Sequence, residues 1–321
     1  MYHHIAPGPA VRPATRFRPN LELFVAEEEF EQQIRHVAAN YECLSVDEAV
    51  QALERGRLPR RTVVVTFDDG YRDNLLAVPI LERYNVPAAI YITTGAIARA
   101  RTFWWDEHET ILERLEALQL SWRGTPRQWD LSSLALKQQA FGDLNLMFKA
   151  LPPAEQDELL AVLRDAARAA GSEPPYFDHE AMLSWDEVVA LDREPLITIG
   201  AHTVDHFVMR QLAEEELHRQ IHESRTDLER HLGHPVTHFA YPFGREEHAD
   251  VREFEAVAND GFASAVTTRP GHWRASAPHA LPRLSVDYSD TMDDFRWKLS
   301  GWSAVLQRLS QRRAAPIPAR V

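Results

Sequence analysis

Cysteine is almost absent from this sequence, which holds one, Cys43, among 321 residues. A single thiol excludes an internal disulfide and any zinc site built from several cysteines. No histidine motif stands beside Cys43, and free cysteines are commonly buried. We therefore expect a structural thiol, with a nucleophilic role as the less favoured alternative.

Long apolar runs and an excess of positive charge are also missing. No stretch of about 18 apolar residues occurs, so the sequence predicts no transmembrane helix. Met1–Pro7 has no apolar core of the kind that a secretory signal needs, which makes the cytoplasm the expected location. Lysine and arginine number 35 against 48 aspartates and glutamates, a formal charge of −13. This balance argues against nucleic acid or an anionic membrane as partner, and the oligomeric state stays open.

The composition is that of a globular protein, with 45% hydrophobic and 26% charged residues. Short β-branched runs alternate with amphipathic segments, which predicts an α/β sheet or barrel with helices outside. The expected strands span 61–67, 87–94, 196–200, 237–241, 263–268 and 280–286. The expected helices outside the insertion described next span about 74–84, 212–232, 251–259 and 291–312. Capping boxes at Ser45–Glu48 and Ser184–Glu187 predict two further helix starts.

One segment breaks this alternation, at about 101–180. It reads as an all-helical insertion with helices near 105–118, 131–151 and 154–170. Insertions of this kind usually lie on the loops at the active face of a barrel. We therefore expect one barrel over 1–290 that includes this insertion, followed by a C-terminal helix and tail over 291–321.

Two polar motifs follow predicted buried strands. Asp68 and Asp69 come directly after the strand at 61–67, where two carboxylates are costly to desolvate unless they have a use. His202 and His206 follow the strand at 196–200 with a spacing of four, which suits a chelating pair. A turn at the aspartates and surface histidines are the alternatives for each motif alone. Together they predict a metal site of one carboxylate and two imidazoles, with a second carboxylate as general base.

Two weaker motifs stand at later strand ends. Tyr241-Pro-Phe-Gly244 ends an aromatic strand at a turn, and its backbone N–H groups can stabilise an oxyanion. Leu281-Pro-Arg-Leu284 places Arg283 at another strand end, with a surface arginine as an equally weighted alternative.

In this order, the four motifs resemble the polysaccharide deacetylase family, the carbohydrate esterases (family 4-like) with the NodB homology domain. The resemblance covers roughly 1–286 and implies a distorted (β/α)7 barrel with a helical insertion. It implies that Asp69, His202 and His206 hold one divalent metal ion, with zinc expected and cobalt, nickel or manganese compatible. By the same resemblance Asp68 is the general base, and the backbone N–H of Phe243 binds the oxyanion.

The implied activity is hydrolytic removal of N-acetyl groups from a saccharide or glycan precursor. An O-acetyl esterase, or a hydrolase of other non-peptide C–N amides, needs the same machinery. A catalytically weak glycan-binding protein is an alternative from another class, although decayed sites tend to lose their ligands first.

This sequence departs from the commonest family pattern in its general acid. No Leu-x-His motif follows Val286, but some relatives supply the acid from an N-terminal Tyr-His strand. Tyr2-His3-His4-Ile5 matches that strand, so His3 is the candidate, with a solvated terminus as the alternative. Met1 stands where the middle of that strand is expected, which implies either a short strand or a late start.

The aromatic motif has Ala240 where other members carry an arginine that orients the base. Arg283 is expected to replace it by pairing with Asp68 and keeping that carboxylate ionised.

Trp104 and Trp105 open the insertion side by side. Adjacent exposed tryptophans can stack on the apolar faces of sugar rings. The somewhat favoured alternative is a hydrophobic plug inside the insertion.

Overall fold

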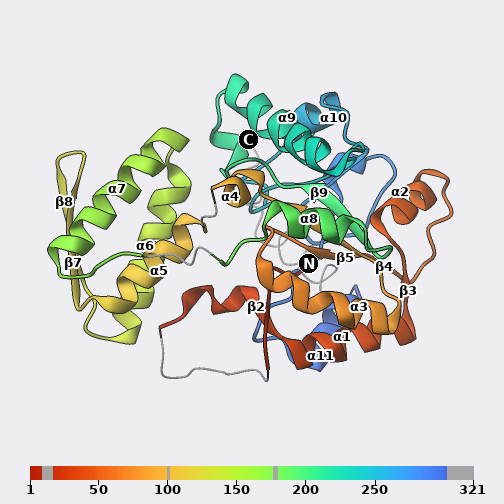
Figure 1. The fold of residues 1–321 in the computed structure, drawn as a ribbon, viewed down its shortest axis with the longest axis horizontal. Helices are drawn as coiled ribbons and strands as arrows, with labels where there is room; N and C mark the ends of the chain where they lie inside the picture. The colour runs from red at the N-terminus through yellow and green to blue at the C-terminus, as the bar shows by residue number, and fades with distance from the viewer. Residues whose placement is uncertain (9–16, 100–101, 176–179, 302–321) are drawn as a thin grey trace, which may run out of the picture.

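The computed structural model describes residues 1–8, 17–99, 102–175 and 180–301. Its centre is a five-stranded parallel sheet in the order β11-β10-β9-β6-β5 (Figure 1). The strands are β5 (Val65–Phe67), β6 (Ala88–Ile92), β9 (Ile197–Ala201), β10 (His238–Ala240) and β11 (Ser264–Val266). Almost every residue in them is buried, as expected of a parallel sheet that helices cover.

Two further segments continue this sheet at its edges. Tyr2 forms a parallel bridge with the last residue of β5, and Leu281 forms one with the last residue of β11. The Val286 N–H donates to the carbonyl of Met1 over 3.0 Å, so these two edge segments also meet each other. The sheet therefore curls into seven parallel positions, which confirms the expected distorted (β/α)7 barrel.

Two short two-stranded sheets accompany the central sheet of the barrel. The strand β1 (His4–Ala6) pairs with β2 (Phe24–Ala26), and β3 (Glu42–Cys43) pairs with β4 (Thr62–Val63). The expected continuous strand over 61–67 is thus wrong, because it divides into β4 and β5, which pair with different partners.

The predicted strand over 280–286 is also wrong. Pro278–Ala280 is a short 3-10 helix, and Leu281 makes only the isolated bridge. The physical reason lies at Pro282, which has no N–H to donate to a ladder. Its carbonyl accepts instead from the indole of Trp273 over 3.0 Å.

Helices cover the barrel on its outside (Figure 1). They are α1 (Glu27–Asn40), α2 (Val46–Glu54), α3 (Val78–Tyr84), α4 (Thr94–Ala98), α8 (Trp185–Asp192), α9 (Glu214–Leu232), α10 (Val251–Asn259) and α11 (Met292–Leu299). Further 3-10 helices span Pro19–Leu23, Arg72–Ala77 and Met209–Gln211. Both predicted capping boxes are present, because Ser45 and Ser184 accept from the N–H three residues on, at 3.1 and 3.2 Å.

Two predicted helices differ from the observed ones. The segment 74–84 is a 3-10 helix followed by α3, and Pro79 stands in the first turn of α3, where its missing N–H costs nothing. The C-terminal helix is described over Met292–Leu299, and the rest of the predicted 291–312 beyond residue 301 lies outside the described residues.

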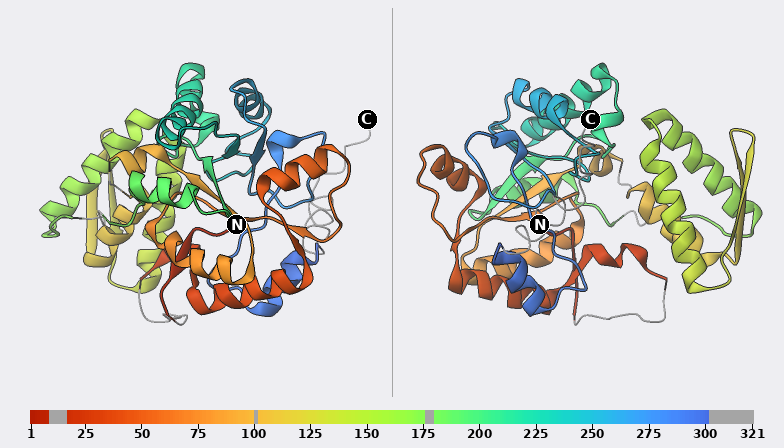
Figure 2. Two further views of the ribbon diagram at one scale, coloured as in Figure 1. Left: turned by 45° about the vertical axis from the view of Figure 1, so that its right-hand side comes forward. Right: turned by 180° about the vertical axis from the view of Figure 1, so that it is seen from behind.

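The insertion lies beside the barrel, as Figure 1 and the right-hand view of Figure 2 show. It consists of α5 (Trp104–Arg114), β7 (Ala117–Trp122), β8 (Thr125–Asp130), α6 (Leu134–Ala150) and α7 (Pro153–Ala169). The expectation of an all-helical insertion is wrong, because β7 and β8 form an antiparallel hairpin. Its turn residues Arg123 and Gly124 have φ of 52° and 77°, which suits a two-residue hairpin loop.

Each part has a core of its own. Phe67, Ile90 and Phe239 from the barrel strands are buried in one cluster with residues of the covering helices. Leu118 of β7 is buried with Leu144 of α6 and other apolar residues of the insertion in a separate cluster. Among the described residues, no helix is long and apolar enough to cross a membrane.

Candidate metal centre and active site

Asp69, His202 and His206 converge at the carboxyl ends of β5 and β9. The Oδ1 atom of Asp69 lies 3.3 Å from Nε2 of His202 and 3.2 Å from Nε2 of His206. All three residues are buried, and their ligand atoms lie within 4.8 Å of one another. In the described part of the chain, no other group of His, Cys, Asp and Glu meets the same geometry.

The donor atoms of this cluster fit a divalent metal ion. The Nδ1 atom of His202 lies 2.7 Å from the carbonyl of Ala240, which can only accept, so Nδ1 carries the proton. The lone pair of Nε2 then faces Asp69, whose Oδ1 receives no hydrogen bond from any described residue. Buried polar atoms without partners are rare unless something else satisfies them. The hydrogen bond from His202 to the Ala240 carbonyl is also typical of metal-binding histidines, whose second ring nitrogen often donates to a backbone carbonyl that orients the ring.

The backbone around the cluster lies in a sparsely populated conformation. Asp69, Thr203, His206 and Phe243 have φ of 79°, 64°, 57° and 58°. A non-glycine residue in this left-handed region costs about 1 kcal/mol or more and persists only where its surroundings enforce it. Four such residues at one site indicate that the fold imposes the directions of these side chains.

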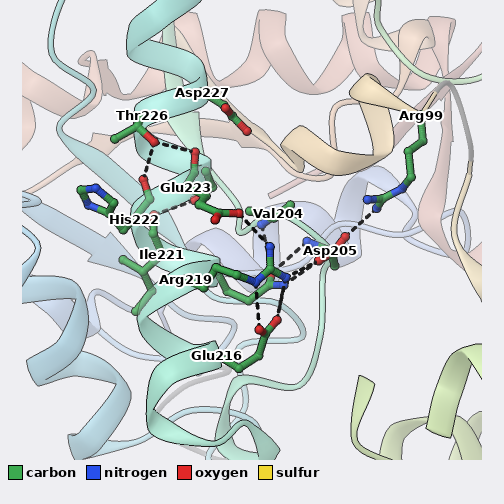
Figure 3. A network of polar contacts seen from close by, with 12 residues as sticks. Arg99, Val204, Asp205, Glu216, Arg219, Ile221, His222, Glu223, Thr226 and Asp227 are labelled. Carbon is green, nitrogen blue, oxygen red and sulfur yellow. Dashed lines mark hydrogen bonds and ion pairs between the residues drawn. The ribbon is translucent and has the colours of Figure 1, made fainter. Parts of the chain in front are cut away.

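Gln220 of α9 clamps the loop between the two histidines. Its buried amide oxygen accepts from the backbone N–H groups of Val204 and Asp205, at 3.1 and 2.9 Å. Its amide nitrogen donates to the Asp205 carboxylate over 2.6 Å. Asp205 also pairs with Arg99 at 2.6 Å and with Arg219 at 3.0 Å (Figure 3). Sequence reasoning missed these residues, because only the fold brings α9 to the loop.

Asp68 has a different environment from its neighbour Asp69. The guanidinium of Arg283 donates two hydrogen bonds to the Asp68 carboxylate, each of 2.6 Å, and both residues are buried. Burial alone would raise the pKa of Asp68, but the charge and hydrogen bonds of Arg283, together with the charges of His202 and His3, outweigh it and hold that pKa below its ordinary value. The predicted pairing is present, and Asp68 is thereby kept ionised.

His3 lies between the bridge at Tyr2 and the start of β1, close enough for the carboxylates of Asp68 and Asp69 to act on it. Burial lowers the pKa of His3, and the two negative charges oppose that effect. Its Nδ1 atom has no hydrogen-bond partner among the described residues, while its carbonyl accepts from the side chain of Asn74 over 2.6 Å. The strand is thus held at the barrel edge, and the role of His3 as acid stays a prediction.

His4 takes no part in this cluster. Its ring stacks on Phe24 with centroids 3.9 Å apart and bonds to Asp73 over 2.6 Å. These contacts assign His4 to the packing of the first strand.

Phe243 occupies a tight turn after β10. The Gly244 N–H donates to the carbonyl of Pro242 over 2.6 Å, so Phe243 is the central residue of a three-residue turn. Thr268 donates to the carbonyl of Phe243 over 2.6 Å, and the phenyl ring lies 4.8 Å from the ring of His206. No described residue accepts from the Phe243 N–H, which leaves this donor available beside the cluster.

Aromatic residues of the insertion form a wall against His206. The ring of Phe103 lies 5.2 Å from that of His206, and the ring of Trp105 lies 4.9 Å from it. Trp105 is 6% exposed and donates to the hydroxyl of Tyr71 over 3.2 Å. Trp104 stacks on Phe148 at 4.7 Å. Trp105 is therefore not exposed as part of a sugar platform, and the alternative of hydrophobic packing describes it, whereas Trp104 is half-buried.

The fold and the buried cluster define an α/β barrel with a candidate metal centre at the carboxyl ends of its strands. A family model described as polysaccharide deacetylase matches residues 55–121 and 142–261, more than half of the chain. The chain therefore belongs to the polysaccharide deacetylase family.

Individual relatives agree with this assignment. The poly-beta-1,6-N-acetyl-D-glucosamine N-deacetylase of Staphylococcus epidermidis is 34% identical over 77 residues, which are 23% of this chain and 26% of that protein. The chain spans about a third or less of the length of the curated relatives it matches.

Solved structures share the fold over nearly the whole length. The deacetylase PplD of Streptococcus pyogenes, in complex with acetate, has a TM-score of 0.59 and 18% identity, covering 93% of this chain and 96% of that one. A de-N-acetylase from Aggregatibacter actinomycetemcomitans has a TM-score of 0.56 and 14% identity, covering 92% and 97%.

Proposed function

We propose that this chain is a metal-dependent hydrolase that removes N-acetyl groups from a saccharide. The observation that carries the proposal is the pair of adjacent carboxylates with separate partners. Asp68 is held ionised by Arg283, while Asp69 faces two imidazoles. One acceptor for protons beside one candidate metal-binding cluster is the set of groups that metal-dependent hydrolysis of an amide uses.

Asp69, His202 and His206 would hold the metal ion. When bound, such an ion supplies a Lewis acid for the acetyl carbonyl and lowers the pKa of a coordinated water. Two imidazoles and one carboxylate suit zinc, cobalt, nickel or manganese, of which zinc is the first expectation.

Asp68, Phe243 and His3 would transfer the protons and stabilise the negative charge that develops during the reaction. Asp68 takes a proton from the attacking water, and Arg283 keeps the carboxylate in place through its double hydrogen bond. The free N–H of Phe243 donates to the oxygen on which negative charge develops. His3 gives a proton to the departing amine nitrogen, without which the C–N bond does not break.

The choice of a saccharide substrate rests on the relatives. The Staphylococcus epidermidis relative is named for deacetylation of poly-beta-1,6-N-acetyl-D-glucosamine, and the family is named for polysaccharides. These names support an acetylated sugar polymer or its precursor as the substrate class.

Acetate release tests the proposal. Purified protein supplied with zinc is incubated with β-1,4- and β-1,6-linked N-acetylglucosamine oligomers and, separately, with O-acetylated sugars. We expect acetate from the amides, and a loss of at least about a hundredfold in Asp68→Asn, because the amide cannot take the proton. Exposed Asp186→Asn on α8 is the matched control and should keep the full rate.

Other results would favour the alternatives. Release from esters alone would point to an O-acetyl esterase on the same barrel. Binding of oligomers without any release would contradict the hydrolase and leave a glycan-binding protein.

A further inference from the structure

The ring of His206 is held differently from the ring of His202. The Nδ1 atom of His202 bonds to the carbonyl of Ala240, whereas Nδ1 of the buried His206 has no hydrogen-bond partner among the described residues. The backbone N–H of His206 donates to Thr203 Oγ1 over 3.0 Å, which fixes the main chain but not the ring. A metal-binding imidazole is usually oriented by a hydrogen bond at its second nitrogen. Some other contact must therefore hold the ring of His206 toward Asp69.

Aromatic rings surround the imidazole of His206 instead. The rings of Phe103 and Trp105 meet it edge to face, at 5.2 and 4.9 Å and with interplanar angles of 60° and 66°. We refer to these two residues as the aromatic wall. From the barrel, the ring of Phe243 meets the same imidazole at 4.8 Å and 80°. Edge-to-face packing is favourable for aromatic rings, and close packing leaves an enclosed ring few orientations. Packing thus takes the place of the missing hydrogen bond.

The aromatic wall is hydrogen-bonded to the barrel. The indole N–H of Trp105 donates to the hydroxyl of Tyr71 over 3.2 Å, and Tyr71 follows Asp69 by two positions in the chain. The Tyr71 hydroxyl donates to the carboxylate of Asp106 over 3.3 Å, and this carboxylate also accepts from the backbone N–H of Phe103 over 3.3 Å. Asp106 therefore closes a ring of hydrogen bonds that joins the start of α5 to the segment after β5.

Further contacts leave the aromatic wall little freedom to move. The rings of Phe103 and Trp105 stack on each other at 4.3 Å with an interplanar angle of 9°, and both residues are 6% exposed. The side-chain amide of Asn20 donates to the carbonyl of Trp105 over 3.0 Å. Because the wall is fixed on the barrel, it can hold the imidazole beside it in one orientation.

The neighbouring Trp104 has no such relation to the metal centre. Its ring stacks on that of Phe148 at 4.7 Å and lies 5.4 Å from that of His108, both in the insertion. In the part of the chain that the structure describes, it makes no ring contact with His206. The two adjacent tryptophans therefore form a matched pair, of which only Trp105 borders the imidazole.

We propose that Phe103 and Trp105 are positioning residues for His206, which hold its imidazole in the orientation that binds the metal ion. The ring of hydrogen bonds through Tyr71 and Asp106 keeps the aromatic wall in place. The insertion thereby contributes to the metal centre without supplying a ligand. The inference rests on the proposed function only for the metal-binding role of the buried cluster.

The zinc affinity of paired variants tests this inference. Full-length Trp105→Leu and Trp104→Leu make the same change at adjacent positions, but only the first removes a ring beside His206. Competition titration with a zinc chelator should show a loss of at least about tenfold in Trp105→Leu and of less than about twofold in Trp104→Leu. Trp105→Phe keeps a ring at this position and should retain most of the affinity.

Cobalt absorption provides a readout that a loss of stability alone does not change. The visible bands of bound Co²⁺ depend on the geometry of its ligands. At saturating Co²⁺, Trp105→Leu should differ from the wild type in these bands, and Trp104→Leu should not. Phe103→Leu is a second variant of the aromatic wall and should weaken zinc binding in the same way. Thermal unfolding without metal identifies any variant that fails to fold.

The outcomes separate this inference from the proposed function. Unchanged zinc affinity and cobalt bands in the folded wall variants would overturn the inference, even if the wild type releases acetate. Equal losses in Trp104→Leu and Trp105→Leu would also overturn it, because the effect would then belong to the insertion as a whole. A loss confined to the wall variants would establish it, even if no acetate is ever released. A wild type that binds neither metal would overturn the metal centre and this inference with it.

Discussion

Asp68 and Asp69 are neighbours in the chain, yet each has its own set of partners. The sequence predicts this division, because successive residues at a strand end point in different directions. The pairing of Arg283 with Asp68 follows from the resemblance to the polysaccharide deacetylase family, because Arg283 lies inside the predicted strand over 280–286 and not after it. Gln220 is not predictable, because a glutamine on a helix carries no signal of which loop it will clamp.

The Gln220 clamp leads to a prediction at the residue scale. Gln220→Leu keeps the side-chain volume but removes the acceptor for two loop N–H groups, so the histidine loop should lose its fixed shape. Residues that orient metal ligands typically contribute about 10–100-fold to metal affinity. Competition titration with a zinc chelator should show a loss of about that size. Exposed Gln51→Leu on α2 is the control, and an unchanged zinc affinity in Gln220→Leu would contradict the clamp.

His3 gives a second prediction at this scale. If it protonates the leaving amine, His3→Ala should slow release from N-acetyl amides more than release from activated acetyl esters, whose leaving groups need no acid. The ratio of the two rates is the measurement, and His4→Ala is the neighbouring comparison. Equal loss on both substrates would place the acid elsewhere.

At the scale of elements, the helices are easier to predict than the strands. Capping boxes identify the starts of α2 and α8, and the predicted bounds of α10 match the observed ones. The sequence does not predict the β7–β8 hairpin, because polar and apolar residues are mixed in its two strands much as they are in the flanking helices. Only the Arg123-Gly124 turn indicates it. The segment at 281–286 has a sequence typical of a strand. Because Pro282 has no N–H to donate, the segment forms only the isolated bridge of Leu281 with Val266.

Helix α5 carries a buried group that should make stability depend on pH. His108 is fully buried among aromatic rings, and neither ring nitrogen has a hydrogen-bond partner in the part of the chain that the structure describes. Burial lowers its pKa to about 3, so the folded protein keeps it neutral at pH 5. The unfolded chain binds a proton near pH 6.5, so stability falls as pH drops through that value, by about 2 kcal/mol at pH 5.

Urea unfolding at pH 7.5 and pH 5 measures this effect. The phenyl ring of His108→Phe suits the aromatic surroundings and does not titrate. Between the two pH values, the free energy of unfolding of this variant should fall by about 2 kcal/mol less than that of the wild type. Exposed His218→Asn on α9 should behave like the wild type. An identical pH dependence in His108→Phe and the wild type would contradict the assignment.

At the scale of the whole molecule, the parallel barrel explains why motifs far apart in sequence meet. Strand ends of a parallel sheet share one edge, so the order of strands and motifs along the chain predicts that Asp69 and His202 lie together. The contribution of the insertion is less visible in the sequence. Phe103 and Trp105 contact His206, and Lys149 at the end of α6 lies 4.4 Å from the ring of Phe243. The insertion therefore has its own core and also contributes side chains that border the candidate metal centre.

Metal content and acetate release measured on one sample test the central claim most directly. Protein stripped with a chelator should release no acetate from N-acetylglucosamine oligomers. Added zinc should restore release and saturate at one ion per chain, and His206→Ala should neither bind zinc tightly nor recover. Unchanged acetate release by protein shown to be metal-free would contradict the account.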